Sequence, residues 1–275
     1  MKILISGASG FIGTRLTERL LQYGHEVVAP THEHMDIAYP HTYPKEGFKG
    51  IDTVYHLAGS VDLSEAQTDP LGVVRDNVIG TACMLEACSR HGVRQFVLAS
   101  SIYAYQGEHL HAATKRCAEE LCRSFQATHG LLCTVLRYGP VYGEGARRGV
   151  VSLLIERALK GEPLILRGDG TQSRHFIHVD DAVQASIQVL GSDLQFGVVM
   201  GSREITLGEL AQAIVQEVGG SHSITYDRRK GDPYYRDAPT VVIKSRRTQQ
   251  LLGWEPEVDL EEGIRRTVEW RKQCL

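Results

Sequence analysis

Three glycines near the start of the chain, Gly7, Gly10 and Gly13, have the spacing G-x-x-G-x-x-G. They follow a short apolar run and lead into a segment in which apolar residues have helical spacing. Glycines permit a tight turn and let the backbone approach a ligand, while the unpaired N–H groups and positive dipole end of the following helix favour a pyrophosphate. The spacing therefore predicts a dinucleotide-binding turn, with Phe11 and Ile12 at the first helical positions beside the ligand.

The segments around these glycines match the elements that such a turn connects. A helix is predicted from Phe11 to about Tyr23 because leucines recur on one face, and Glu26–Ala29 have the composition of a second strand. A glycine-rich turn between a strand and a helix can also exist without a ligand. The strand–turn–helix–strand order favours the dinucleotide over that alternative.

Strands and helices alternate over the first half of the chain. Apolar strands are predicted near Thr53–Leu57, Gln95–Ala99 and Leu132–Leu136, separated by helices near Leu71–Arg90 and His111–Thr128. Alternation of this kind builds parallel, right-handed β-α-β units. The expected fold class is therefore α/β, with a Rossmann doubly wound parallel sheet.

The alternation stops after the segment Gly139–Gly143. We expect residues 1–145 to form the dinucleotide-binding Rossmann core, with segments at about 175–200 returning to it, and residues 146–275 to form mainly a smaller, mixed substrate-binding lobe. The crevice between the two parts is where a substrate would bind. The elements predicted beyond the core are a helix near Val150–Lys160, a strand at Leu164–Leu166, and helices from about Val179, at Leu207–Val218 and at Leu260–Lys272, the last two joined by a polar stretch.

Composition argues against several classes of protein. The chain has 275 residues, 42% of them hydrophobic, so it can bury a large core. Its net charge of -3 gives no electrostatic footprint for nucleic acid or an anionic membrane. Its six cysteines lack C-x-x-C spacing, which predicts reduced thiols and neither disulfides nor a metal site. The start lacks the features of a secretory signal and no apolar run reaches the ~20 residues that span a bilayer, so a cytoplasmic protein is expected.

Further motifs extend over nearly the whole chain. They are His56-Leu57-Ala58-Gly59, Asn77–Thr81, Ala99-Ser100-Ser101, Arg137–Gly143, Gly168–Asp181 and Leu252–Pro256. Together with the glycine turn they resemble the extended short-chain dehydrogenase/reductases, in particular the NAD-dependent epimerase/dehydratase group that acts on nucleotide sugars. The combination is far more specific than any one motif.

The resemblance implies hydride exchange at a sugar carbon, with a Tyr as acid/base and a Lys four residues later. Residues i and i+4 share a helix face, so the ammonium can hold the cofactor ribose and lower the pKa of the phenol from about 10. In this chain Lys115 is present but His111 stands where the Tyr is expected. Only nine residues separate Ser101 from His111, where the family has a longer loop. Ser101 is expected to polarise the sugar oxygen, or else to bond local backbone at its strand end.

Three interpretations of the missing Tyr stay open. An imidazole can give and take protons near neutral pH, and the adjacent Lys115 would lower its pKa, so a neutral His111 can serve as a base but is a weaker acid. Tyr103 or Tyr105 could instead supply a phenol from another direction. In the third interpretation the chain is a catalytically degenerate dinucleotide-binding protein with a sensing or assembly role.

The resemblance also implies residues for the substrate. Arg174, Arg229 and Asp232 lie at the places where nucleotide-sugar epimerases hold the nucleotide, and Tyr105 is expected beside the substrate. Guanidinium groups pair bidentately with phosphate oxygens, which suits a nucleotide diphosphate. Against this, Pro140 replaces an Asn of the family pattern and cannot donate a hydrogen bond, and the basic run around Arg229 also suits an ordinary solvated surface. A nucleotide-sugar substrate is expected.

The cofactor is expected to be NAD or NADP, and NAD is preferred. By resemblance, Leu57, Ala58 and Lys115 line its site, and Asp36 contacts the adenine unless it only satisfies its own turn. An acid at the end of the second strand would bind the ribose 2′-hydroxyl and repel a 2′-phosphate. The strand ends Ala29-Pro30-Thr31-His32, with neither an acid nor an Arg at those four positions.

The resemblance also limits the type of reaction that the protein is expected to catalyse. Dehydratases of the family carry an Asp-Glu pair directly after the catalytic Thr, so that one acid can protonate a leaving hydroxyl. Ile102 and Tyr103 occupy those positions, so epimerisation or ketone reduction remains. Reduction of a substrate that is no nucleotide sugar would leave Arg174 and Arg229 dispensable. Family members commonly pair through two helices, which implies a homodimer through the two long helices of the core.

Overall fold

The computed structural model describes residues 1–44, 46–61, 65–227 and 245–274, and they divide into two compact units. The first unit comprises Met1–Tyr138, Val183–Val198 and the described residues that end at Trp254. The second comprises Gly139–Ala182, the described residues from Val199, and those from Glu255 onward. Each unit is described by itself.

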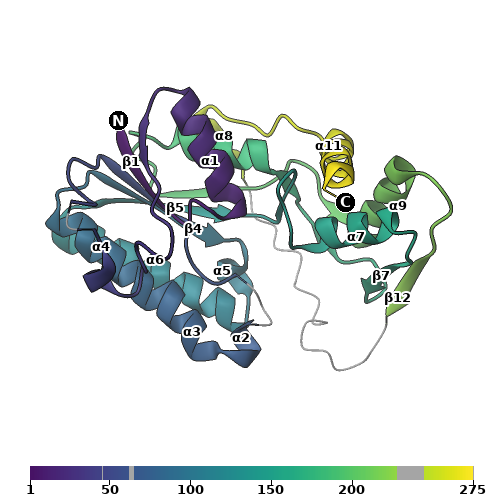
Figure 1. The fold of residues 1–275 in the computed structure, drawn as a ribbon, viewed down its shortest axis with the longest axis horizontal. Coiled ribbons are helices and arrows are strands. Elements are labelled where there is room, and N and C mark those ends of the chain that lie inside the picture. Colours follow the sequence, from purple (N-terminus) through teal and green to yellow (C-terminus); the bar gives the residue numbers. More distant parts are fainter. Residues whose placement is uncertain (45, 62–64, 228–244, 275) are drawn as a thin grey trace. The chain divides into compact units, whose positions relative to one another are not determined.

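A six-stranded sheet forms the centre of the first unit (Figure 1). Its strand order is β10-β5-β4-β3-β1-β2, and the ladders from β2 through β1, β3 and β4 to β5 are parallel. The order reverses between β1 and β3, and in such sheets ligands bind at the carboxyl ends of the strands where it reverses. The predicted α/β class and Rossmann sheet are confirmed. The strands are β1 (Lys2–Ser6), β2 (Glu26–Val28), β3 (Thr53–His56), β4 (Gln95–Ser101), β5 (Leu132–Tyr138) and β10 (Phe196–Val199).

Helices cover both faces of this sheet, α1 and the end of α8 on one face and α4 and α6 on the other (Figure 1). On the first face, the hydroxyl of Tyr55 in β3 donates to the carbonyl oxygen of Ser186 in α8 at 2.7 Å. On the second, Met84 of α4 and Ala118 of α6 are buried in one core with Phe96 of β4. This burial fixes α6, whose first turns carry the predicted catalytic residues. The helices are α1 (Phe11–Gln22), α4 (Gly80–Arg90), α6 (Leu110–His129) and α8 (Val179–Gln188).

The helix predicted near Leu71–Arg90 is not one regular α-helix. It consists of α3 (Pro70–Val74), a π-helical turn η2 (Arg75–Ile79) and α4. A π turn changes which side chains face inward, and such turns are frequent at functional sites. Asn77 lies at its centre and is 2% exposed. The other short helices of this unit are η1 (Pro40–Thr42), α2 (Glu65–Thr68), α5 (Tyr103–Gln106) and α10 (Arg246–Leu252). The sequence predicts no helix at α10, which lies in the polar stretch between the last two predicted helices.

The second unit packs three helices around its own apolar core. Leu154 of α7, Leu210 of α9 and Ile264 of α11 are all buried in it. The described residues of this unit also form three two-stranded ladders, β7 with β12, β6 with β9, and β8 with β11. The elements are β6 (Val141–Tyr142), α7 (Val150–Leu159), β7 (Leu164–Arg167), β8 (Ser173–Arg174), β9 (Ile177–His178), β11 (Ile205–Thr206), α9 (Leu207–Val218), β12 (Ile224–Asp227) and α11 (Leu260–Gln273).

All six cysteines are free thiols. Cys88, Cys122 and Cys133 are buried, whereas Cys117 and Cys274 are exposed. In the described part of the chain, no helix has the length and apolar character needed to cross a membrane.

Candidate active site

Two of the three motif glycines are required by the protein's own backbone. Gly7 has a φ of 76°, and a Cβ there would lie 2.6 Å from the backbone nitrogen of Ala58. A Cβ at Gly13 would lie 2.1 Å from the carbonyl oxygen of Gly7. These two glycines therefore let the turn fold tightly between the ends of β1 and β3.

The N-terminus of α1 offers donors to an anion. Gly10 is the N-cap, no side chain caps this end of α1, and no acidic residue lies in its first turn. The first N–H groups of a helix lack intrahelical partners and, with the positive dipole end, favour a negative charge. A Cβ at Gly10 would meet only the Gly7 carbonyl, at 3.2 Å, so close approach of a ligand explains this glycine better than internal packing does. The turn thus fits a dinucleotide pyrophosphate. Phe11 and Ile12 are half-buried at the start of α1, and their contact with the cofactor stays a prediction.

The ends of β1 and β3 are tied together beside this turn. The backbone N–H groups of Leu57 and Ala58 donate to the carbonyl oxygen of Ser6 at 3.0 and 3.1 Å. The structure therefore brings Leu57 and Ala58 to the glycine turn, as the resemblance implies. Their contact with a cofactor stays a prediction.

Asp36 lies in the loop between β2 and β3, where it stabilises its own turn. Its carboxylate accepts a hydrogen bond from the N–H of Ala38 at 3.0 Å and lies 3.7 Å from Nε2 of His32. Such a bond two residues on is an ordinary role for a loop Asp. An adenine contact by Asp36 stays a prediction.

Lys115 is a buried ammonium at the carboxyl end of β4. It is 6% exposed, and its Nζ donates to the carbonyl oxygen of Ala99 at 2.8 Å. Burial lowers the pKa of Lys115 to about 8, and the carboxylate of Glu119, one turn later on α6, opposes that shift. Because an ammonium is costly to bury, its position here needs a reason beyond packing.

His111 lies one turn before Lys115 and is 7% exposed. Burial and then the charge of Lys115 lower the pKa of His111 to about 4, while a hydrogen bond to the carbonyl oxygen of Ser60 opposes the shift. The sequence predicts this direction from Lys115 alone, but burial is the larger cause. At neutral pH the imidazole is therefore neutral and can accept a proton.

Ser101 and the two tyrosines surround the start of α6. The Ser101 hydroxyl oxygen accepts a hydrogen bond from the N–H of Tyr103 at 3.3 Å, as a strand-end serine does. Tyr103 meets the ring of His109 edge to face, with centroids 5.5 Å apart. Tyr105 is 57% exposed, and the guanidinium of Arg137 lies 5.6 Å from its ring centroid. Their roles toward a substrate stay predictions.

The structure adds a buried ion pair behind Lys115 that the sequence analysis did not identify. Glu119 accepts from Nε and Nη2 of Arg137 at 2.8 and 2.5 Å and from the hydroxyl of Ser100. A bidentate pair of this kind holds α6 against β4 and β5. The position of Glu119, four residues after Lys115, could have indicated a second inward-facing charge on the same helix face.

A second buried network joins the end of β1 to the π turn. Nδ1 of His56 lies 2.7 Å from the hydroxyl of Ser6, and Nε2 lies 3.1 Å from the hydroxyl of Thr81. The Thr81 hydroxyl itself donates to the carbonyl of Asn77 at 2.7 Å, so it accepts from His56 Nε2–H. Burial, and then the charge of Lys115, lower the pKa of His56 to about 3.

We expect His56 to destabilise the protein in acid. Its pKa is about 3 in the folded state and 6.5 when exposed, so the unfolded chain binds more protons below pH 6.5 and the free energy of unfolding falls with pH toward 3. At pH 5 this one group should cost about 2 kcal/mol relative to pH 7. Urea unfolding at both pH values measures the loss. His56→Gln should remove this part of the pH slope, whereas His129→Gln, at an exposed site, should keep it; equal slopes in the two variants would contradict the expectation.

Of the residues predicted to hold the nucleotide, the structure describes one. Arg174 lies in β8 of the second unit, half-buried, and its Nη1 donates to the carbonyl oxygen of Ser173 at 2.7 Å. Arg229 and Asp232 lie outside the described residues. Among the described residues, no group of three or more His, Cys, Asp or Glu side chains has a metal-binding arrangement.

The glycine turn, the buried Lys115 and the sheet order define a class, the dinucleotide-dependent α/β enzymes. Within that class, the NAD dependent epimerase/dehydratase family matches residues 3–197, and the chain belongs to this family. The resemblance drawn from the motifs is thereby confirmed.

Relatives and a solved structure align over the whole chain. A putative UDP-glucose 4-epimerase of Methanocaldococcus jannaschii is 28% identical, with 98% of each chain covered. UDP-glucuronic acid decarboxylase 1 of Xenopus tropicalis is 29% identical, covering 100% of this chain and 73% of that protein. The crystal structure of Thermotoga maritima UDP-glucose 4-epimerase with UDP-glucose superposes with a TM-score of 0.90 at 26% identity, covering 100% of this chain and 99% of the other.

Proposed function

We propose that this protein binds NAD and transfers hydride at a sugar carbon of a UDP-sugar, as an epimerase. The observation that carries the proposal is the buried ammonium of Lys115 on the helix face that also carries His111, beside the end of β3. A Cβ at Gly59, directly after Ala58, would lie 3.9 Å from Lys115 Nζ, so the ammonium lies close to the strand end that meets the glycine turn. Relatives that act on UDP-sugars support the substrate class.

The residues of the first unit have complementary roles in this proposal. When bound, NAD supplies the carbon that accepts the hydride. The sugar hydroxyl loses its proton to the neutral imidazole of His111 as a hydride leaves the carbon that bears this hydroxyl. The products of this step are a ketone and an imidazolium. Lys115 holds the cofactor ribose, and Ser101 donates to the sugar oxygen. Return of the hydride to the other face of the ketone, and of the proton from His111, yields the epimer and restores both groups.

The remaining predicted contacts belong to the same proposal. Arg174, Arg229 and Asp232 hold the UDP moiety, and Tyr105 lies beside the sugar. A homodimer through α4 and α6 is also proposed, because Cys83 and Glu86 of α4 line an open groove with Phe125 and His129 of α6. In this arrangement the α6 residues of the pairing surface lie at the C-terminal end of the helix, away from its start, which carries His111 and Lys115.

The test begins with protein purified without added cofactor. One portion is denatured and any released dinucleotide is identified by mass. A second, folded portion is emptied of cofactor and titrated with NAD⁺, NADP⁺ and their reduced forms. Folded protein is then given UDP-glucose or UDP-glucuronic acid deuterated at C4 with NAD⁺ and, in a parallel reaction, with NADPH. We expect retained NAD and an epimer that keeps the deuterium, because the enzyme returns the hydride that it took. Stoichiometric consumption of NADPH would indicate a reductase, and no affinity for any dinucleotide would overturn the proposal.

A further inference from the structure

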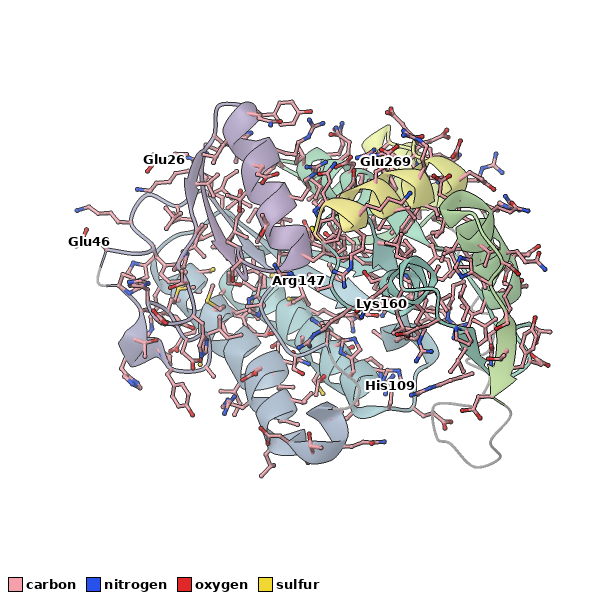
Figure 2. All side chains as sticks on the ribbon, turned by 45° about the vertical axis from the view of Figure 1, so that its right-hand side comes forward. Glu26, Glu46, His109, Arg147, Lys160 and Glu269 are labelled. Carbon is pink, nitrogen blue, oxygen red and sulfur yellow. The ribbon has the colours of Figure 1, made fainter. Side chains whose placement is uncertain are left out.

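Two histidines at the start of α6 are stacked on each other. The rings of His109 and His111 lie 22° from parallel with centroids 5.9 Å apart. His109, which is labelled in Figure 2, is the N-cap of the helix. Each ring uses its Nδ1 for a backbone hydrogen bond. His109 Nδ1 bonds the N–H of Ala112 at 3.1 Å, and His111 Nδ1 bonds the carbonyl oxygen of Ser60 at 3.4 Å.

These two partners require opposite tautomers. A backbone N–H can only donate, so Nδ1 of His109 has the lone pair and its proton lies on Nε2. A carbonyl oxygen can only accept, so Nδ1 of His111 must be protonated. In the neutral ring of His111, the lone pair is then on Nε2. The Ser60 carbonyl therefore determines which ring nitrogen of His111 can act as a base.

Asn77 fixes that carbonyl from the π turn. Its amide Nδ2 donates to the Ser60 carbonyl oxygen at 2.9 Å and to the hydroxyl of Thr114 at 3.0 Å. The Thr114 hydroxyl in turn donates to the backbone carbonyl of His111 at 3.0 Å. Asn77 is 2% exposed, so its side chain is held in place by the packing around it. The π turn is what brings this amide to the loop that follows β3.

We infer that Asn77 is a positioning residue that holds the Ser60 carbonyl and so keeps His111 in the Nδ1–H tautomer, with Nε2 as its proton acceptor. Among the described residues, the charged and titratable groups that face this ring are Lys115 on the same helix and His109 stacked against it. Neither offers Nδ1 an acceptor, so within this described part of the chain the Ser60 carbonyl sets the tautomer. The meaning of this tautomer for catalysis rests on the proposed function.

In the proposed reaction, this tautomer gives a complete proton path. The sugar hydroxyl proton bonds to Nε2, and the imidazolium so formed keeps its Nδ1–H on the Ser60 carbonyl. The proton leaves from the same Nε2 in the return step, so the tautomer is restored at each turnover. A ring with Nε2–H would have no lone pair facing away from Ser60 and could not accept the proton there.

Nuclear magnetic resonance of histidine-labelled, cofactor-free protein tests the inference without any substrate. The ¹⁵N and ¹³Cδ2 shifts distinguish the two neutral tautomers, and the spectra of His111→Gln and His109→Asn identify the two signals. His109→Asn keeps a side-chain acceptor at the N-cap. We expect the Nδ1–H form for His111 and the Nε2–H form for His109, which serves as an internal reference. An Nε2–H signal from His111 would overturn the inference.

The variant Asn77→Ala tests the role of Asn77 itself. With the amide gone, the Ser60 carbonyl loses the donor at 2.9 Å, and we expect His111 to become a mixture of tautomers while the signal of His109 stays unchanged. Thr134→Val is the matched control, because it removes a buried partner of Gln95 far from the site. An unchanged His111 tautomer in folded Asn77→Ala would contradict the role, and if that variant does not fold, Asn77→Ser is measured in its place. If the protein shows the expected tautomers but has no epimerase activity, this inference is upheld and the proposed function is refuted.

Discussion

His111→Phe should lower kcat for UDP-sugar epimerisation by about 100- to 10,000-fold, the usual contribution of a general acid/base. The phenyl ring fills nearly the same volume at a site that is 7% exposed, so the start of α6 should stay folded. It has no nitrogen to take the sugar hydroxyl proton. Because the glycine turn and Lys115 are untouched, NAD affinity should be nearly unchanged. Turnover under saturating UDP-sugar and a titration with NAD⁺ measure the two quantities.

Tyr103→Phe and Tyr105→Phe are the comparison variants, since either phenol is the alternative acid/base. If His111 carries the proton, Tyr103→Phe should keep most of its activity. Tyr105→Phe should keep its kcat, whatever its KM, because its ring only lies beside the sugar. Loss of turnover in one of them, together with an active His111→Phe, would assign the role to that phenol instead. His111→Tyr would then restore the residue that the family pattern expects, next to an ammonium that lowers the pKa of a phenol.

Local spacing was enough to predict the parts of the site that lie on one element. The glycine turn needs only residues 7–13 and the flanking elements, because Gly7 and Gly13 leave room for the backbone of the turn and of the next strand, while Gly10 leaves the start of α1 open to a ligand. Lys115 was predicted from the family resemblance, and the helix face that positions i and i+4 share explains why the family pattern has that spacing. The direction of the His111 pKa shift was also predictable from that spacing, but its main cause, burial, depends on what packs over α6.

Contacts between elements that are distant in the chain could not be predicted from the sequence. Asn77, Ser60 and His111 come from three segments, and only the π turn aims the Asn77 amide at Ser60. A π turn has the same apolar pattern as an ordinary helix over a few residues, so the pattern at 71–90 predicts one α-helix. The pairing of Glu119 with Arg137 likewise depends on how α6 lies against β5. Contacts of this kind can be identified only when the order of the strands in the sheet is known.

Gly7→Ala should destabilise the protein more than the same substitution at a positive-φ glycine that has free space around it. An alanine at φ 76° costs about 1–2 kcal/mol in backbone strain. Its Cβ would also lie 2.6 Å from the nitrogen of Ala58, and relieving such overpacking in a rigid turn costs about 1–3 kcal/mol more. The free energy of unfolding in urea measures the sum. NAD affinity should fall as well, because the turn must open where it faces the pyrophosphate.

Gly24→Ala separates the two causes. Gly24 has a φ of 78°, almost that of Gly7, but a Cβ there would meet nothing within 4 Å. It should therefore show the backbone strain alone and leave NAD affinity unchanged. The difference in the free energy of unfolding between the two variants isolates the contact of Gly7, after β1, with Ala58, after β3. The strand order reverses between these two strands. Equal losses of stability and unaltered NAD binding in both would mean that the turn tolerates a side chain, and that its glycine is not there to hold the two strand ends together.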